Sequence, residues 1–143
     1  GRRAVLALLL LATRALALDQ SQIQSACDAD CETETGSNPD YKACVARAAD
    51  KADTALNQAY KDMLGVVRAA GKEMGQASDI QAGDLKDAQK QWIAYRDANC
   101  AFEDSLAFGG TAIGGNYSSC LCALSYQRIN DFDRIKKDVL GGK

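Results

Sequence analysis

The fold of this 143-residue chain is decided by residues 38–67, NPDYKACVARAADKADTALNQAYKDMLGVV. Apolar or small side chains recur there at steps of three or four residues, which is the period of a helix that buries one face. These positions are Tyr41, Val45, Ala48, Ala52, Leu56, Ala59, Met63 and Val67. The unbroken period predicts one long helix.

The ends of this helix are marked by residues with known terminal preferences. Ser37 or Asn38 can act as the N-cap, and Pro39 suits the first helical position. Asp40 interacts favourably with the positive end of the helix dipole. We expect the helix to end around Ala70-Gly71, where a polar, glycine-containing connection begins.

Two further helices are predicted downstream. The second would begin at Asp84, after a connection over residues 71–83, and the third would run from about Ser118 to Val139, where Gly141-Gly142 stops it. The periodic face of the second helix consists of Leu85, Ala88, Trp92, Tyr95, Asn99, Phe102 and Leu106. That of the third consists of Leu121, Leu124, Phe132 and Ile135.

A glycine-rich segment, FGGTAIGGNY over residues 108–117, separates the second and third helices. Four glycines in ten residues do not form a stable helix interior, so we expect a shaped loop. The chain is therefore predicted to be all-α. It would form a small disulfide-stapled bundle of about three main helices, with this loop between the second and the third, in one domain over residues 18–143.

The first 17 residues have the organisation of a secretory signal peptide. Arg2 and Arg3 precede an apolar run over residues 4–12, and Ala15-Leu16-Ala17 offers a cleavage site of the small-x-small type. The apolar run is too short to cross a bilayer, so we expect no stable membrane insertion after cleavage. A buried or interfacial helix is the alternative. A signal peptide predicts an exported protein.

Cleavage would make the protein distinctly acidic. The full chain has 17 basic and 19 acidic residues, and loss of Arg2, Arg3 and Arg14 changes the formal charge from −2 to −5. With no long basic stretch present, nucleic acid is not expected as a partner. Residues 19–34 contain Asp and Glu but no Lys or Arg, and we interpret them as a solvated arm or, alternatively, as an acidic face for a basic partner.

Six cysteines in a chain expected to be exported indicate disulfide bonds and leave several pairings open. A tetrathiolate metal site is the alternative, because Cys27 lies close to Cys31 in the sequence and Cys120 lies close to Cys122. Neither spacing is the C-x-x-C that is usual in zinc sites. We therefore expect disulfides, and neither a metal nor another cofactor.

Histidine is absent, which excludes Ser-His-Asp and Cys-His nucleophiles and imidazole metal ligands. One catalytic alternative is a glycosidase-type pair of carboxylates among Asp97, Glu103 and Asp104, close to the loop. Carboxylates on an acidic helix surface are usually solvated. We expect a protein that is not an enzyme.

Several short motifs, taken together, resemble a known family. They are Leu56-Asn57-x-x-Tyr60, Leu85-x-x-Ala88-Gln89-x-x-Trp92-x-x-x-Arg96-Asp97-x-x-Cys100, Gly109-Gly110, Cys120-Leu121 and Arg128. In this order and spacing they are similar to the lysozyme inhibitor LprI-like N-terminal domains, with a match over about residues 31–128. That family consists largely of small exported bacterial proteins of unknown function, and its name comes from a lipoprotein described as a lysozyme inhibitor.

The resemblance also implies a disulfide pairing, because the family pattern has one cysteine pair near the N-terminus and one that brackets the glycine loop. The pairs implied here are Cys31 with Cys44, Cys100 with Cys120 and, as a departure from the commoner pattern, Cys27 with Cys122. Pairing of Cys27 with Cys44 and of Cys31 with Cys122 is the alternative.

The first group of candidate binding residues lies on the second helix. Trp92 is three residues from Tyr95 and four from Arg96, so the aromatic and guanidinium groups can stack. In a structural interpretation, Trp92 and Tyr95 are core residues. Arg96 or Asp97 would then tie the helix to the third helix or to the loop by charged hydrogen bonds. In a functional interpretation, these four residues contribute to a binding site.

The second group lies in and beside the loop. A disulfide that brackets the loop would hold it in one shape, so that a partner meets a preorganised surface. Gly109 and Gly110 permit close approach of a backbone, and Asn116 and Tyr117 add polar and aromatic contacts.

These features favour a non-enzymatic binding protein, and the resemblance implies an inhibitor of lysozyme-type peptidoglycan hydrolases. A basic lysozyme-like protein is the expected partner, because a negatively charged inhibitor would encounter it faster. The alternative is a structural or envelope-associated module without inhibitory activity.

Overall fold

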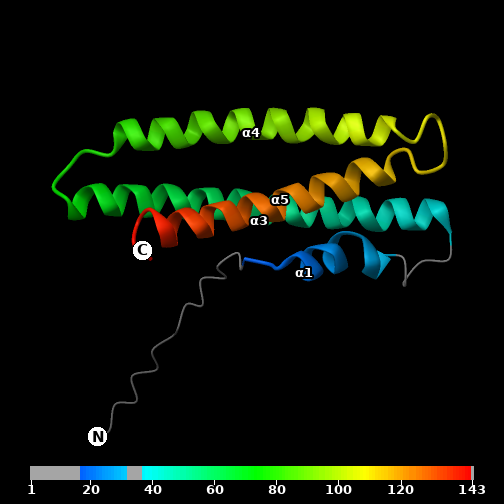
Figure 1. Cartoon of the computed structure of the whole chain (residues 1–143), viewed down its shortest axis with the longest axis horizontal. Coiled ribbons are helices and arrows are strands. Elements are labelled where there is room, and N and C mark those ends of the chain that lie inside the picture. Colours follow the sequence, from blue (N-terminus) through cyan, green and yellow to red (C-terminus); the bar gives the residue numbers. More distant parts are fainter. Residues whose placement is uncertain (1–16, 32–36, 143) are drawn as a thin grey trace, which may run out of the picture.

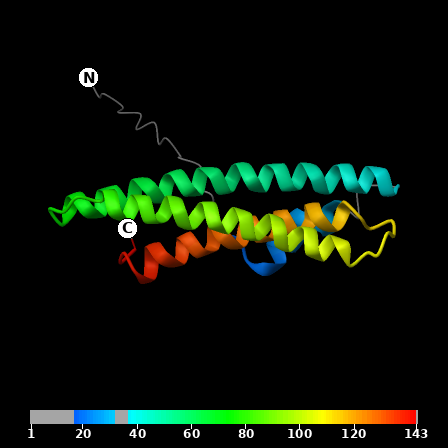
Figure 2. The same ribbon diagram turned by 90° about the horizontal axis from the view of Figure 1, so that it is seen from above.

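The computed structural model describes residues 17–31 and 37–142, and within these ranges the regular structure is entirely helical (Figure 1). The elements are α1 (Gln20–Gln24), the π-helical turn η1 (Ser25–Ala29), α3 (Asn38–Glu73), α4 (Asp79–Ser105) and α5 (Gly115–Asp138). The long helices α3, α4 and α5 run along one axis, and Figure 1 shows α4 and α1 on opposite sides of the α3–α5 pair. Figure 2 shows the same elongated arrangement from above. The predicted all-α fold with three main helices is confirmed.

Helix α3 begins as the sequence indicates and ends slightly later. The Ser37 hydroxyl caps it by accepting a hydrogen bond from the backbone N–H of Asp40, 3.3 Å away, and Pro39 lies in the first turn. The helix continues through Gly71 to Glu73, because the next connection folds back onto it. A Cβ at Gly71 would lie 2.8 Å from Cβ of Ser78, so this glycine permits close approach and does not end the helix.

The starts of α4 and α5 differ from the prediction. Helix α4 begins at Asp79 and includes Gly83, whereas we expected a start at Asp84. Gly83 is exposed within the helix, a placement that costs only about 1 kcal/mol relative to alanine. Helix α5 begins at Gly115, and not at Ser118, so the loop is shorter than expected.

The described part of the acidic N-terminal segment, residues 19–31, is helical from Gln20 onward, which corrects the interpretation as a solvated arm. Asp19 caps α1 in a capping box with Gln22, in which each side chain accepts from the other residue's backbone N–H. The side chain of Asn130 in α5 both donates to and accepts from the backbone of Leu18, at 2.7 and 3.0 Å. Ile23 and Cys27 turn inward and are buried, while Asp19 and Asp30 stay on the outside.

Two adjoining clusters form the core. One joins the N-terminal segment to α3 and α5, and the other fills the space between α3 and α5 farther along the bundle. The first contains Ile23, Cys27, Ala49, Ala52 and Cys122, and the second contains Leu56, Ala59, Met63, Ile129 and Phe132. The alanines on α3 allow α5 to approach closely, so these two helices form the central pair.

Three disulfides staple the bundle, with sulfur–sulfur distances of 2.00–2.06 Å. They join Cys27 to Cys122, Cys31 to Cys44 and Cys100 to Cys120, which are the pairs that the resemblance implies. The alternative pairing of Cys27 with Cys44 is wrong. The first of these bonds ties η1 to α5 and therefore holds the N-terminal segment on the bundle.

The predicted signal peptide falls almost wholly on residues 1–16, which lie outside the described residues. Across the part of the chain that the structure describes, no helix combines the length and the apolar character that a membrane crossing would require.

Candidate functional site

Arg96 and Asp97, two of the candidate residues on α4, belong to a partly buried polar network in the middle of the bundle. Arg96 is only 8% exposed, and its guanidinium donates to Asp53 of α3 at 2.9 Å, to Asp97 at 3.0 Å and to the hydroxyl of Ser125 at 3.1 Å. Ser125 in turn donates to the backbone carbonyl of Leu121, 2.6 Å away. One arginine thus connects all three long helices.

Trp92 lies beside this network and contacts two arginines. The guanidinium carbons of Arg96 and Arg128 lie 5.6 and 5.7 Å from the centre of the Trp92 ring, within the range of cation–π attraction. Arg128 also lies 4.7 Å from the ring centre of Phe132, and it donates to the side chain of Gln89 at 3.0 Å. Helices α4 and α5 are therefore tied together by stacking as well as by hydrogen bonds.

The two arginines have pKa values shifted in opposite directions. Burial opposes the charge of Arg96, but the hydrogen bonds that it donates to the carboxylates of Asp53 and Asp97, together with their negative charges, outweigh this effect, so the pKa of Arg96 lies above its ordinary value. Burial lowers the pKa of Arg128, because Asp131 at 3.6 Å offsets only part of the desolvation. Both side chains remain cations at neutral pH.

These contacts support the structural interpretation of Trp92, Arg96 and Asp97. The guanidinium of Arg96 binds groups within this chain, and with 8% of the residue exposed it offers little surface to a partner. Tyr95 differs, because it is 61% exposed and is not the core residue that the periodicity indicated. The buried face of α4 instead passes through Gln89, Arg96 and Cys100, a polar stripe that hydrophobic periodicity does not detect.

The loop between α4 and α5 is held at both of its ends. The Cys100–Cys120 disulfide joins the helices on either side of it. One carboxylate oxygen of Asp104 accepts the backbone N–H groups of Gly114, at 2.8 Å, and Tyr117, at 3.1 Å, so α4 caps the start of α5. This cap explains why α5 begins before Ser118 and why Asn116 and Tyr117 lie in its first turn.

Glycine is required at the tip of this loop. Gly109 has a φ of +81°, a conformation that favours glycine. A Cβ on Gly110 would lie 3.0 Å from the carbonyl oxygen of Ala107. The side chain of Asn38 in α3 donates to the carbonyl oxygen of Thr111, 3.2 Å away, and so attaches the loop to a third helix. The predicted shaped loop is present, with Gly109 and Gly110 at its turn.

Phe108, at the tip of the loop, is unusual in both its exposure and its backbone conformation. Its side chain is 88% exposed, and its backbone has a φ of +49°, the left-handed region that costs an aromatic residue about 1 kcal/mol or more. A large apolar side chain in water and in a strained conformation gives nothing to the fold. Such outliers are a common feature of binding sites.

Other apolar side chains are exposed in the loop and along the part of α4 that leads to it. Tyr95, Phe102 and Leu106 fall on one stripe of α4, at spacings of seven and four residues, and Ile113 lies in the loop. We call the group the loop-end surface; its members are Tyr95, Phe102, Leu106, Phe108 and Ile113. Of these, the sequence indicated only Tyr95 as a binding residue. The departure of Phe102 and Leu106 from the core depends on packing that periodicity cannot reveal.

The carboxylates considered for catalysis have other partners. Asp97 accepts from Arg96, Glu103 accepts from the side chain of Asn99 at 3.1 Å, and Asp104 caps α5. Glu103 also lies within 4.8 Å of both sulfurs of the Cys100–Cys120 disulfide. Since those sulfurs are joined to each other and are not thiolates, this group is a covalent clamp and not a set of metal ligands.

The sequence of this chain is similar to that of a known family and of one curated protein. The sequence pattern of the family described as lysozyme inhibitor LprI matches residues 27–132, which include the end of η1, all of α3 and α4 and most of α5. A curated relative, the uncharacterized protein R02472 of Rhizobium meliloti (strain 1021), is 32% identical over 113 residues, which are 77% of this chain and 81% of the relative. No solved structure gives a significant match.

Proposed function

The chain belongs to the lysozyme inhibitor LprI family, and on that premise we propose that it binds a lysozyme-type peptidoglycan hydrolase and blocks it through the loop-end surface. Phe108 is the observation that carries the proposal. An aromatic side chain that is 88% exposed, on a strained backbone, at the tip of a disulfide-held loop has the properties of an interface anchor.

Preorganisation supports this role for the loop. Ordering a mobile loop on binding costs free energy, and a loop already held by a disulfide, by Asp104 and by Asn38 avoids most of that cost. Aromatic anchors surrounded by other apolar contacts are typical of tight interfaces. Phe102 and Leu106 supply such surroundings.

Charge and compartment support it as well. With the proposed signal peptide removed, the formal charge of −5 would accelerate the encounter with a basic hydrolase at low salt. Three disulfides suit the periplasm or the cell exterior, where enzymes that cleave peptidoglycan act. The proposed role is binding, and no catalytic step is assigned to this chain.

The test is an inhibition assay with the purified protein. We expect it to slow lysis of a peptidoglycan suspension by at least one lysozyme type at near-stoichiometric ratio. Phe108→Ala should weaken inhibition by about 30-fold, the size expected of an anchor residue. Ile80→Ala is the matched control, because Ile80 is 75% exposed but lies at the opposite end of α4.

Two results would reject the proposal. The first is the absence of inhibition against several lysozyme types, which would favour a structural envelope module. The second is an equal loss of inhibition in Phe108→Ala and Ile80→Ala, which would mean that the loop-end surface has no special role.

A further inference from the structure

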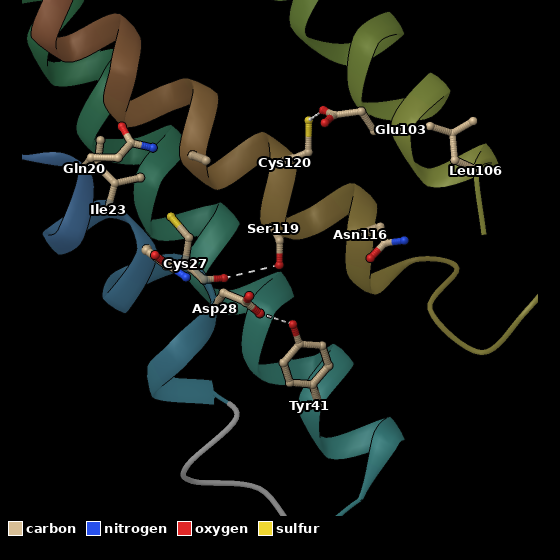
Figure 3. Close-up of a pocket in the computed structure, with 12 residues that line it drawn as sticks. Gln20, Ile23, Cys27, Asp28, Tyr41, Glu103, Leu106, Asn116, Ser119 and Cys120 are labelled. Carbon is tan, nitrogen blue, oxygen red and sulfur yellow. Dashed lines mark hydrogen bonds between the residues drawn. The ribbon is translucent and has the colours of Figure 1, made fainter.

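A cleft of about 480 Å³ opens beside the loop-end surface (Figure 3). Helix α5 forms its floor with Asn116 and Ser119, η1 lines one side with Asp28, and the end of α4 lines the other with Glu103 and Leu106. Leu106 belongs to the cleft and to the loop-end surface at once. A protein that covers the loop would therefore also cover the mouth of the cleft.

The charges that line the cleft are all negative. Asp28 and Glu103 are its ionisable carboxylates, and Lys and Arg are absent from its lining residues, all of which the structure describes. The hydroxyl of Tyr41 donates to Asp28, and Asn99 donates to Glu103, so both carboxylates are held in place. Figure 3 shows them on different sides of the cleft.

The neutral lining groups also suit a cation. The side-chain carbonyls of Gln20, Gln24 and Asn116 are further hydrogen-bond acceptors, and the Tyr41 ring offers a face for cation–π contact. A guanidinium has five N–H donors in a planar fork and no acceptor, so it matches a site with many acceptors. An ammonium group would satisfy fewer of them.

We propose that this cleft receives a basic side chain, preferentially an arginine, of the hydrolase that docks on the loop end. This inference rests on the proposed function and extends it, since it assigns a second contact and its chemistry. Closing the cleft with a neutral group would remove Asp28 and Glu103 from water with one neutral donor each and no opposite charge, which is costly. A cation compensates for that desolvation, so the cleft would select partners with a basic residue at this position.

One experiment tests the cleft without any lysozyme. Acetyl-arginine methylamide is titrated into the isotope-labelled protein, with acetyl-norleucine methylamide as the uncharged control. We expect the arginine probe alone to shift the NMR signals of Ser119 and of the Asn116 side chain. In the double variant Asp28→Asn, Glu103→Gln, the affinity for the arginine probe should fall at least tenfold. Asparagine and glutamine keep the shape and one acceptor oxygen of each original side chain, so the fold should be retained.

A second experiment measures inhibition by the same double variant. We expect it to weaken inhibition at least tenfold at low salt and to reduce the dependence of inhibition on salt. The control is Asp84→Asn with Asp87→Asn, which changes the net charge equally but lies on an exposed part of α4 away from the cleft. This control should inhibit within about twofold of the unmodified protein.

The outcomes separate the two proposals. If the unmodified protein inhibits no lysozyme, the proposed function fails, and the arginine titration still decides the chemistry of the cleft. If inhibition is present but the cleft variant inhibits as well as its charge control does, the cleft proposal is overturned and the loop-end proposal stands. Shifts caused by a chitin oligosaccharide and not by the arginine probe would also overturn it.

Discussion

The middle of the bundle contains Arg96, a residue of the family pattern, and the loop end contains Phe108, which directly precedes the pattern's Gly109-Gly110 but is not itself part of the pattern. The two side chains are used in opposite ways. In the middle, Arg96 is 8% exposed and its donors are satisfied by groups on α3, α4 and α5. At the loop end, Phe108 is 88% exposed and its side chain contributes nothing to the core. A motif residue therefore indicates a binding role only once its partners within the chain are known.

The two regions are also held rigid for different purposes. In the middle, charged hydrogen bonds fix how α4 sits on α3 and α5, which determines the fold. At the loop end, the Cys100–Cys120 disulfide and the Asp104 cap fix the shape of an exposed surface. Substitutions should distinguish the two regions, because one kind changes stability alone and the other changes stability and binding together.

The largest effect is expected from removal of the loop clamp. Cys100→Ala with Cys120→Ala should lower the free energy of unfolding by about 3 kcal/mol, from the chain entropy of a loop of this size. It should also weaken inhibition more than tenfold, because the loop must then be ordered on binding. Urea unfolding and the lysis assay measure the two quantities.

The Cys31–Cys44 bond provides the matched control for this prediction. It closes a loop of 13 residues in sequence separation, against 20 for the clamp, so its removal should cost a similar free energy. Inhibition should persist in Cys31→Ala with Cys44→Ala. Equal loss of inhibition in both double variants would show that the clamp acts through stability only.

The next effect is expected from the middle of the bundle. Arg96→Met keeps an unbranched side chain that replaces the aliphatic stem of the arginine but removes three hydrogen bonds, and we expect a loss of about 2 kcal/mol in unfolding free energy. The loss is moderate because Asp53 and Asp97 are about half exposed and can be solvated by water. Folded Arg96→Met protein should inhibit within about twofold of the unmodified protein. A larger change in inhibition would place Arg96 in the binding site after all.

The sequence predicted the class of fold, the three long helices and the glycine loop because these depend on local periodicity and on residues that end helices. The family pattern supplied the disulfide pairs. The start of α5 was missed because its cap, Asp104, comes from another helix across the loop. The structured N-terminal segment was missed for a similar reason, since Ile23 and Cys27 are buried only against α3 and α5.

The candidate site was predicted only in part. The loop was found from its glycines, but the exposed apolar side chains around it were not. On α4, a polar residue, Arg96, takes the inward position while Tyr95, one residue earlier, faces water. Hydropathy assigns the opposite placement, because it counts apolar area and ignores the half-exposed carboxylate of Asp53 and the buried hydroxyl of Ser125, which make Arg96 favourable there.

A smaller effect tests the cap at the loop end. Asp104→Ala removes the acceptor for the N–H groups of Gly114 and Tyr117 and should lower stability by about 1 kcal/mol. Amide hydrogen exchange at both positions should become faster, while exchange near Arg96 stays unchanged. Asp104→Asn retains an acceptor oxygen and should recover most of the loss. If it does not, the charge of Asp104 matters more than the hydrogen bonds.

The smallest expected effect is the change in stability caused by glycine at position 108, and its sign is what makes it informative. Glycine normally destabilises a protein because it increases the entropy of the unfolded chain. At Phe108, with a φ of +49°, glycine also relieves backbone strain, so Phe108→Gly should leave stability unchanged or raise it by up to about 1 kcal/mol. Phe102→Gly removes an exposed phenylalanine from the helical backbone of α4 and should lower stability by about 1 kcal/mol. Both variants should inhibit more weakly.

Calorimetric unfolding of the two variants measures the two changes in stability. If Phe108→Gly and Phe102→Gly destabilise the protein equally, the backbone at Phe108 is not strained, and only the exposure of Phe108 supports its binding role.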